Sequence, residues 1–243
     1  GEADEVVQME KSEGGTWFYV KEGDLHKLYY TYKVTVDGVT RESNDPYAKA
    51  AGVNGRRSMV VDLAKTNPEG FTEDKGPEVK KWTDIVVYEM SVLDTTSDES
   101  CGAKNPGKYI GLTETGLKTP EGVATGLDHI LDLGVTHVQI MPAYDFGSID
   151  ESKPEVPQYN WGYDPINYNL PEGSFSTDPF HGEVRIKEFK QMVQSFHEHG
   201  LGVIMDVVYN HTYDIDNNCF QKCVPDYYYR ITEDGEYSDA SAC

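Results

Sequence analysis

Residues 202–211, with the sequence Gly-Val-Ile-Met-Asp-Val-Val-Tyr-Asn-His, constrain the fold of this chain most strongly. The apolar residues form a run of strand length, and polar side chains follow at Asp206, Asn210 and His211. Such a run is typical of a buried parallel strand that delivers polar side chains at its carboxyl end. In an α/β barrel, the functional residues lie at that end of the strands.

Strand and helix patterns alternate before this stretch. Short apolar runs at 85–90 and 135–141 predict strands, and apolar residues at helical spacing predict helices over about 125–133 and 183–199. Thr125 followed by Asp128 predicts a capping box at the start of the first helix. The order predicts right-handed β-α-β units and a parallel sheet.

The length of the chain limits how much of such a barrel it holds. A complete (β/α)8 barrel needs about 250 residues, and residues 82–243 have room for only its first three β/α units. We therefore expect a truncated TIM (β/α)8 barrel, with a different and smaller sheet as the alternative. Residues 143–181 are predicted to be irregular, and an irregular segment of that length usually has a functional reason.

The first quarter of the chain has a different pattern. Short alternating strands rich in β-branched and aromatic residues, with an Asp37-Gly38 turn, predict a small β-sandwich over residues 1–64. Its tyrosines and Trp17 are read as core or cross-strand residues, with a sugar-stacking platform as the alternative. Polar residues with prolines and glycines predict a surface linker over 65–81, before the α/β part at 82–243.

Charge and hydropathy exclude several classes of partner. Acidic residues outnumber basic ones 42 to 21, and the sequence shows no basic patch, so we expect no nucleic acid partner. No apolar stretch approaches the roughly 20 residues that a membrane span needs, so we expect a soluble protein with no membrane partner. The compartment stays open between cytoplasmic and secreted, bacterial-type proteins.

The chain has four cysteines, which are too few for a scaffold built on disulfides. Three residues separate Cys219 from Cys223, and the chain has no second pair of matching spacing, as a zinc site would need. A reduced pair and a single local disulfide both remain open.

Several motifs resemble the α-amylase superfamily, glycoside hydrolase family 13. Residues 206–211 resemble its first conserved region, and residues 135–142 resemble its second-strand segment. The run Tyr-Asn-Trp-Gly-Tyr-Asp-Pro at 159–165 is similar to the signature of type I pullulanases, and the similarity continues through 167–190. Motifs within 23–55 resemble the later part of a family 48 carbohydrate-binding module, which makes the predicted sandwich incomplete.

The resemblance implies roles for five residues. Tyr163 matches the tyrosine that stacks on the sugar next to the scissile bond, with Asp164 beside it, and His211 matches the histidine that bonds the same sugar. Asp206 matches a buried aspartate that holds the site together, and Asn210 is a candidate ligand for a structural calcium ion, the one cofactor expected. Each residue also has a purely structural alternative, as a packed loop aromatic, a strand-end histidine or a backbone cap.

The implied function is debranching of α-glucans by a retaining mechanism, with hydrolysis of α-1,6 links in pullulan and branched dextrins. This mechanism needs two carboxylates about 5 Å apart, and the resemblance places both beyond Cys243. We therefore expect no catalytic residue here, an inactive isolated chain, and a second polypeptide as a candidate to complete the barrel. The alternatives are a non-catalytic α-glucan-binding protein or another family 13 enzyme, such as an isoamylase, a branching enzyme or an α-amylase.

Overall fold

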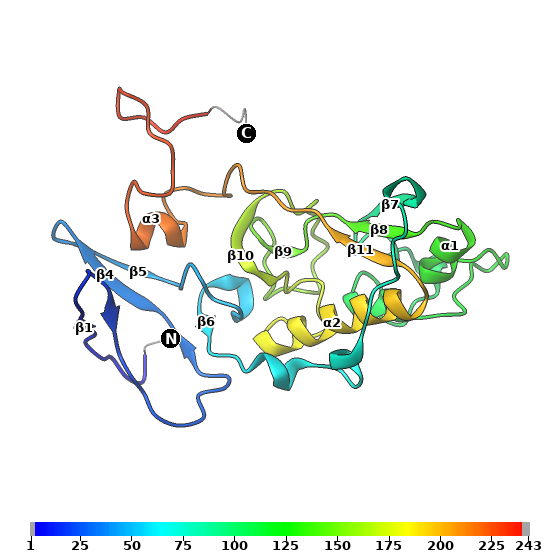
Figure 1. Ribbon diagram of the computed structural model, residues 1–243, viewed down its shortest axis with the longest axis horizontal. Helices are drawn as coiled ribbons and strands as arrows, with labels where there is room; N and C mark the ends of the chain where they lie inside the picture. Colours follow the sequence, from blue (N-terminus) through cyan, green and yellow to red (C-terminus); the bar gives the residue numbers. More distant parts are fainter. Residues whose placement is uncertain (1–2, 240–243) are drawn as a thin grey trace.

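A three-stranded parallel sheet lies at one end of the molecule (Figure 1). The computed structural model describes residues 3–239, so Cys243 lies outside the described residues. The sheet contains β7 (Val87–Met90), β8 (His137–Ile140) and β11 (Gly202–Met205), in the order β11-β8-β7. The register pairs Met90 with Ile140 and Ile140 with Met205, so all three strands end at one edge. The predicted parallel sheet is confirmed.

Two helices connect the strands and bury their apolar faces against the sheet. They are α1 (Gly126–Asp132) and α2 (Gly182–Glu198), close to the predicted bounds. Leu127 and Ile130 of α1 share one hydrophobic core with Met192 and Phe196 of α2 and with Val138 of β8. Burial of this apolar area against β8 stabilises the sheet.

The predicted capping box at α1 is wrong. The hydroxyl of Thr125 donates to the carbonyl of Cys101 at 2.9 Å. The carboxylate of Asp128 accepts from the amides of Gly116 at 2.6 Å and Leu117 at 3.1 Å. Both side chains tie the preceding loop to the helix, so neither serves the first turn of α1.

The segment predicted to be irregular contains a second sheet, which corrects that prediction. Strands β9 (Tyr144–Phe146) and β10 (Pro165–Pro171) pair in antiparallel fashion with shifts in register. In Figure 1 they lie between the parallel sheet and the N-terminal strands. The loop that joins them carries residues 159–164.

The N-terminal strands form three two-stranded antiparallel ladders. These pair β1 (Glu10–Lys11) with β2 (Trp17–Phe18), β3 (Tyr29–Tyr30) with β6 (Ser58–Met59), and β4 (Tyr32–Val36) with β5 (Val39–Ser43). Positive φ at Asp37 (50°) and Gly38 (77°) gives the predicted two-residue hairpin turn. Trp17 is exposed, and it pairs across the strands with Lys11, whose ammonium lies 6.0 Å from the centre of the ring. Of the two structural interpretations, the cross-strand one therefore holds for Trp17.

Residues 63–74, which include the first part of the predicted linker, pack along α2. The ammonium of Lys190 donates to the carbonyl of Leu63 at 2.9 Å and to the hydroxyl of Thr66 at 2.7 Å. His197 Nδ1 lies 2.6 Å from the carboxylate of Asp74. This segment is therefore held against α2.

Short helical turns complete the described structure. They are η1 (Val53–Gly55), η2 (Leu63–Thr66), η3 (Phe71–Glu73), η4 (Trp82–Asp84), η5 (Glu99–Cys101), η6 (Tyr109–Thr113) and the short helix α3 (Cys219–Cys223). Within the described residues Cys101, Cys219 and Cys223 are free thiols, so Cys219 and Cys223 form no disulfide with each other. No helix within residues 3–239 is long and apolar enough to cross a membrane.

Candidate functional site

Three of the four residues predicted to bind sugar come together at the carboxyl edge of the parallel sheet. Asp206 directly follows β11, and its amide donates to the carbonyl of Ile140 at 3.0 Å. The hydroxyl of Tyr163 donates to Asp206 Oδ2 at 2.7 Å. His211 Nε2 lies 2.6 Å from the carbonyl oxygen of Tyr163. One loop residue is thus held from both its side chain and its backbone.

The ring of Tyr163 remains accessible although its hydroxyl is fixed. The residue is 37% exposed. Partial burial, and then the hydrogen bond to Asp206, raise the pKa of Tyr163 to about 12. The phenol therefore stays protonated at neutral pH and keeps donating to Asp206. A partly exposed aromatic ring in a fixed orientation is suited to stack against the apolar face of a sugar.

The hydrogen bonds of His211 define its tautomer. Nε2 faces a carbonyl oxygen, which accepts, so Nε2 carries the proton. Nδ1 lies 2.9 Å from the side-chain amide nitrogen of Asn210, which donates to it. Both ring nitrogens of the neutral imidazole are therefore used within the chain, and His211 can bond a sugar hydroxyl only by exchanging one of these partners.

Asp164 is held within its own loop. Its Oδ1 accepts from the side-chain amide of Asn160 at 2.7 Å, and its Oδ2 accepts from the hydroxyl of Ser148 at 3.0 Å. Burial raises the pKa of Asp164, while the hydrogen bonds from Asn160 and Ser148 act in the opposite direction. In this structure Asp164 stabilises the turn that presents Tyr163, and a direct contact with sugar remains a prediction.

Gly162 is required by the path of the same loop. Its φ is +95°, and a Cβ added there would lie 2.1 Å from the carbonyl oxygen of Pro142. Its backbone amide donates to Asn160 Oδ1 at 2.8 Å, and the side-chain amide of Asn160 donates to the carbonyl of Gly147 at 2.7 Å. The Asn-x-Gly spacing before Tyr163 therefore has a local geometric cause.

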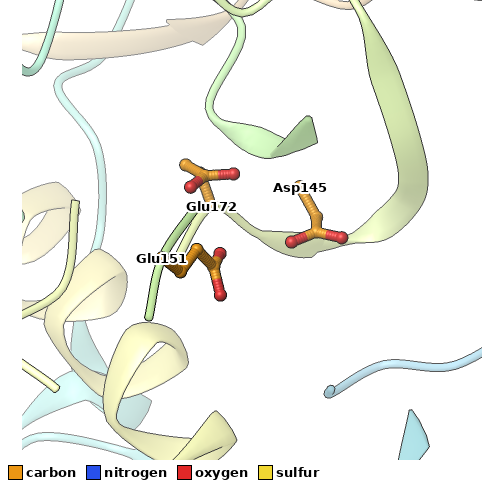
Figure 2. Close-up of side chains that lie close together, drawn as sticks. All are labelled: Asp145, Glu151 and Glu172. Carbon is orange, nitrogen blue, oxygen red and sulfur yellow. The ribbon is translucent and has the colours of Figure 1, made fainter. Parts of the chain in front are cut away.

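Asn210, the predicted calcium ligand, is exposed and faces His211. Within residues 3–239, the side chains that come close enough to share a metal ion are Asp145, Glu151 and Glu172, whose ligand atoms lie within 4.8 Å of one another. Figure 2 shows these buried carboxylates brought together from separate segments. Sequence reasoning singled out none of the three for metal binding.

The guanidinium of Arg185 lies among these carboxylates. It is fully buried, and its two terminal nitrogens lie 3.2 Å from Asp145 Oδ1 and 2.8 Å from Glu151 Oε2. Glu172 accepts from the amides of Phe146 at 3.1 Å and Ser174 at 2.8 Å. Carboxylate oxygens suit calcium, and the single guanidinium of Arg185 balances only one of the three carboxylates. The cluster is therefore the acidic group within residues 3–239 whose oxygens lie close enough to share a metal ion.

The cluster also joins the N-terminal strands to the loop that carries Tyr163. The amide of Asn54 donates to Glu151 Oε2 at 2.6 Å, and the amide of Glu151 donates to Asn54 Oδ1 at 2.7 Å. Asn167 of β10 donates to Asp145 of β9 at 2.5 Å. Buried polar groups must be paired, so these contacts hold β9 and β10 in place against the N-terminal part.

The excess of buried carboxylates predicts a dependence of stability on pH. Burial, and then the neighbouring Glu151, raise the pKa of Asp145 to about 7, and burial also raises the pKa of Glu172 well above its usual range. From about pH 4 to about pH 7 the folded chain keeps a proton on Asp145 that the unfolded chain releases. The free energy of unfolding should therefore fall as pH rises through this window.

Urea unfolding at a series of pH values tests this prediction. Asp145→Asn removes one of the two buried protons, so the decline between pH 4 and pH 7 should become shallower than in the parent protein. The exposed Asp132→Asn serves as the matched control and should keep the parent slope. An Asp145→Asn variant with the full parent slope would contradict this assignment.

Comparisons with known proteins agree with the motifs. Residues 87–239 match the family model described as alpha amylase, catalytic domain. A pullulanase from Bacillus subtilis (strain 168) is 38% identical over 246 residues, which cover 97% of this chain and 32% of the relative. The chloroplastic pullulanase 1 of Arabidopsis thaliana is 32% identical, over 96% of this chain and 28% of the relative.

Solved structures give the same result. A crystal structure of a pullulanase from Paenibacillus barengoltzii, in complex with maltohexaose and α-cyclodextrin, superposes with a TM-score of 0.95 and is 49% identical, over 97% of this chain and 37% of that one. A pullulanase from Bacillus acidopullulyticus gives a TM-score of 0.93 and 47% identity, over 98% and 29%. The chain spans between 28% and 37% of the length of these four relatives.

Proposed function

We infer, since the chain belongs to the α-amylase family of catalytic domains, that it contributes part of the substrate site of a pullulanase-type glycoside hydrolase. The proposed reaction is hydrolysis of α-1,6 links in pullulan and branched dextrins. The observation that carries the proposal is the hydrogen-bonded set of Tyr163, Asp206 and His211 at the carboxyl edge of a parallel sheet. This edge is where barrel enzymes bind and convert substrate.

Each residue has a role that follows from its contacts. Tyr163 offers its ring to the apolar face of a glucose unit, and Asp206 fixes that ring through the phenol hydroxyl. His211 holds the backbone of Tyr163, and it would offer a ring nitrogen to a sugar hydroxyl when substrate displaces an internal partner. These groups bind and orient the sugar, and proton transfer at the glycosidic oxygen requires a separate pair of carboxylates.

Asp206 is not proposed as one of that pair. Its Oδ2 accepts from Tyr163 at 2.7 Å, so the carboxylate is committed to holding the stacking ring. We propose that the nucleophile and the general acid follow later strands, and that residues 82–239 correspond to the first three β/α units of a (β/α)8 barrel. The N-terminal strands would belong to a sandwich of the family 48 carbohydrate-binding type.

The outer edges of the sheet support this arrangement. Within the described residues, β7 and β11 each pair on one side only, with β8. Val87 at one edge and Met205 at the other are exposed. Unpaired apolar strand edges are a liability that a folded protein covers, so we propose that further barrel strands cover them.

Hydrolysis of pullulan tests the function. The protein that carries this chain is expected to release short α-1,4-linked oligosaccharides from pullulan and to leave linear amylose intact, because the cleaved link is α-1,6. Product analysis on both polymers measures this preference. Cleavage of amylose in place of pullulan would favour an α-amylase, and binding of α-glucan with no cleavage of either polymer would favour a non-catalytic binding protein.

A further inference from the structure

A second concave site lies where the N-terminal strands meet the segment after β11. The cavity has a volume of about 540 Å³, which is in the range of roughly 300–1,000 Å³ typical of small-molecule sites. Its lining includes Glu42 and Arg56 from the N-terminal part and Tyr213, Asp214, Asn217 and Lys222 from the later segment. Tyr163, Asp206 and His211 are not among its lining residues.

The walls of this cavity are fixed to the rest of the fold. The amide of Tyr213 donates to the carbonyl of Pro165 at 2.9 Å. The ring of Tyr213 lies so close to Gly147 that an added Cβ would come within 2.3 Å of it. Across the cavity, the side-chain amide of Asn44 donates to Asn167 of β10 at 2.5 Å. The two sides are therefore held at a set separation, as a preformed site requires.

The charges that line the cavity balance. Arg56 and Lys222 form no ion pair within the described part of the chain, although acidic residues outnumber basic ones 42 to 21 overall. Glu42 and Asp214 supply the opposing charges. A metal cation placed here would face Arg56 and Lys222, and a phosphate would face Glu42 and Asp214. The lining therefore favours a ligand without net charge.

The lining of the cavity offers both hydrogen-bond donors and hydrogen-bond acceptors. Glu42 Oε1 accepts from Thr31 at 2.9 Å, which leaves Oε2 as an acceptor, and Asp214 has lone pairs beyond its two bonds to Asn217. Arg56 and Lys222 offer donors. A sugar hydroxyl donates and accepts, so it needs partners of both kinds. Tyr213, 52% exposed, adds an aromatic face for stacking.

We propose that this cavity is an accessory binding site for an α-glucan oligosaccharide, separate from the Tyr163 site and formed jointly by the N-terminal strands and the segment after β11. The choice of α-glucan among neutral sugars rests on the proposed function. The site would hold a second stretch of a polymeric substrate, which raises the effective concentration of the same chain at the Tyr163 site.

Isothermal titration of the protein with maltotetraose tests the proposal. The Arg56→Ala/Lys222→Ala variant should bind one maltotetraose fewer per protein, or bind it at this site at least about tenfold more weakly, because hydrogen bonds to charged donors are lost. Lys187→Ala, which removes an exposed lysine from α2, is the matched control and should bind as the parent does. Tyr163→Ala should remove a different binding event and leave this one.

Each result distinguishes the two proposals. If the parent protein binds maltotetraose and the double variant binds it with unchanged stoichiometry and affinity, the accessory site is overturned while the proposed function stands. If the parent binds no α-glucan at all, the proposed function and the accessory site both fall. Titration with inorganic phosphate and with calcium should give no heat that the double variant removes, and heat of that kind would overturn the assignment to a neutral sugar.

Discussion

Replacing Arg185 with methionine is expected to lower the free energy of unfolding by about 3–5 kcal/mol, the range for removing one partner from a buried ion pair. The guanidinium is fully buried and lies within ion-pair distance of Asp145 and Glu151. Although burial opposes it, the surrounding carboxylates raise the pKa of Arg185, so its charge is present at every pH that the fold tolerates. Methionine would fill much of the volume but would leave the carboxylates without this partner.

Urea unfolding at pH 7 measures the loss, and two comparisons identify its cause. Arg230→Met at an exposed position should change the free energy of unfolding by less than about 0.5 kcal/mol, as surface substitutions usually do. The penalty of Arg185→Met should also shrink at pH 4, because Asp145, whose pKa is about 7, is then protonated and no longer needs a cation. A penalty that is equal at both pH values would show that lost packing, and not charge, is responsible.

The parallel sheet could be predicted because its strands follow the hydrophobic pattern. Residues 202–205 and 137–140 come from continuous apolar stretches, and each stretch follows a glycine with positive φ, Gly200 and Gly134, that ends a helix. Burial between two layers requires such runs. The sequence therefore carried a direct signal for the core and for the edge at which Asp206 lies.

Strands β9 and β10 could not be predicted in the same way, because buried polar residues occupy positions where apolar ones would signal a strand. Asp145 in β9 and Asn167 in β10 are both buried, and they satisfy each other by a hydrogen bond of 2.5 Å. Periodicity of hydropathy is blind to such a pair. The same is true of Arg185, whose partner Asp145 is 40 residues away, and of Glu151, whose partner Asn54 is 97 residues away.

In the candidate site, the grouping of residues could be predicted from the sequence, and the hydrogen-bond partners of the short polar side chains could not. The grouping of Tyr163 with Asp206 and His211 was foreseen because two of the three follow one predicted strand and the third belongs to a recognisable motif. The commitments of Asp164 and Asn210 to neighbouring side chains depend on loop geometry. No local pattern in the sequence indicates which way these short polar side chains turn.

Replacing Tyr163 with alanine is expected to weaken binding of maltotetraose at its site by about tenfold to a hundredfold. Covering an aromatic ring with a ligand contributes on the order of 1.5–3 kcal/mol, and each 1.4 kcal/mol corresponds to about tenfold in affinity. The ring is available for this contact because Asp206 fixes it through the hydroxyl alone. Isothermal titration measures the change, and Tyr227→Ala, at an exposed tyrosine that belongs to neither proposed sugar site, is the matched control.

Tyr163→Phe separates stacking from structure. Phenylalanine keeps the ring and loses only the bond to Asp206, so binding should fall by no more than a few fold, within the roughly 0.5–1.5 kcal/mol of one hydrogen bond. A loss as large as that of Tyr163→Ala would contradict stacking and assign the effect to the Asp206 contact. Both variants keep the bond between His211 and the backbone carbonyl at position 163. The turn should therefore hold its path, and the difference in affinity between the variants would report the ring itself.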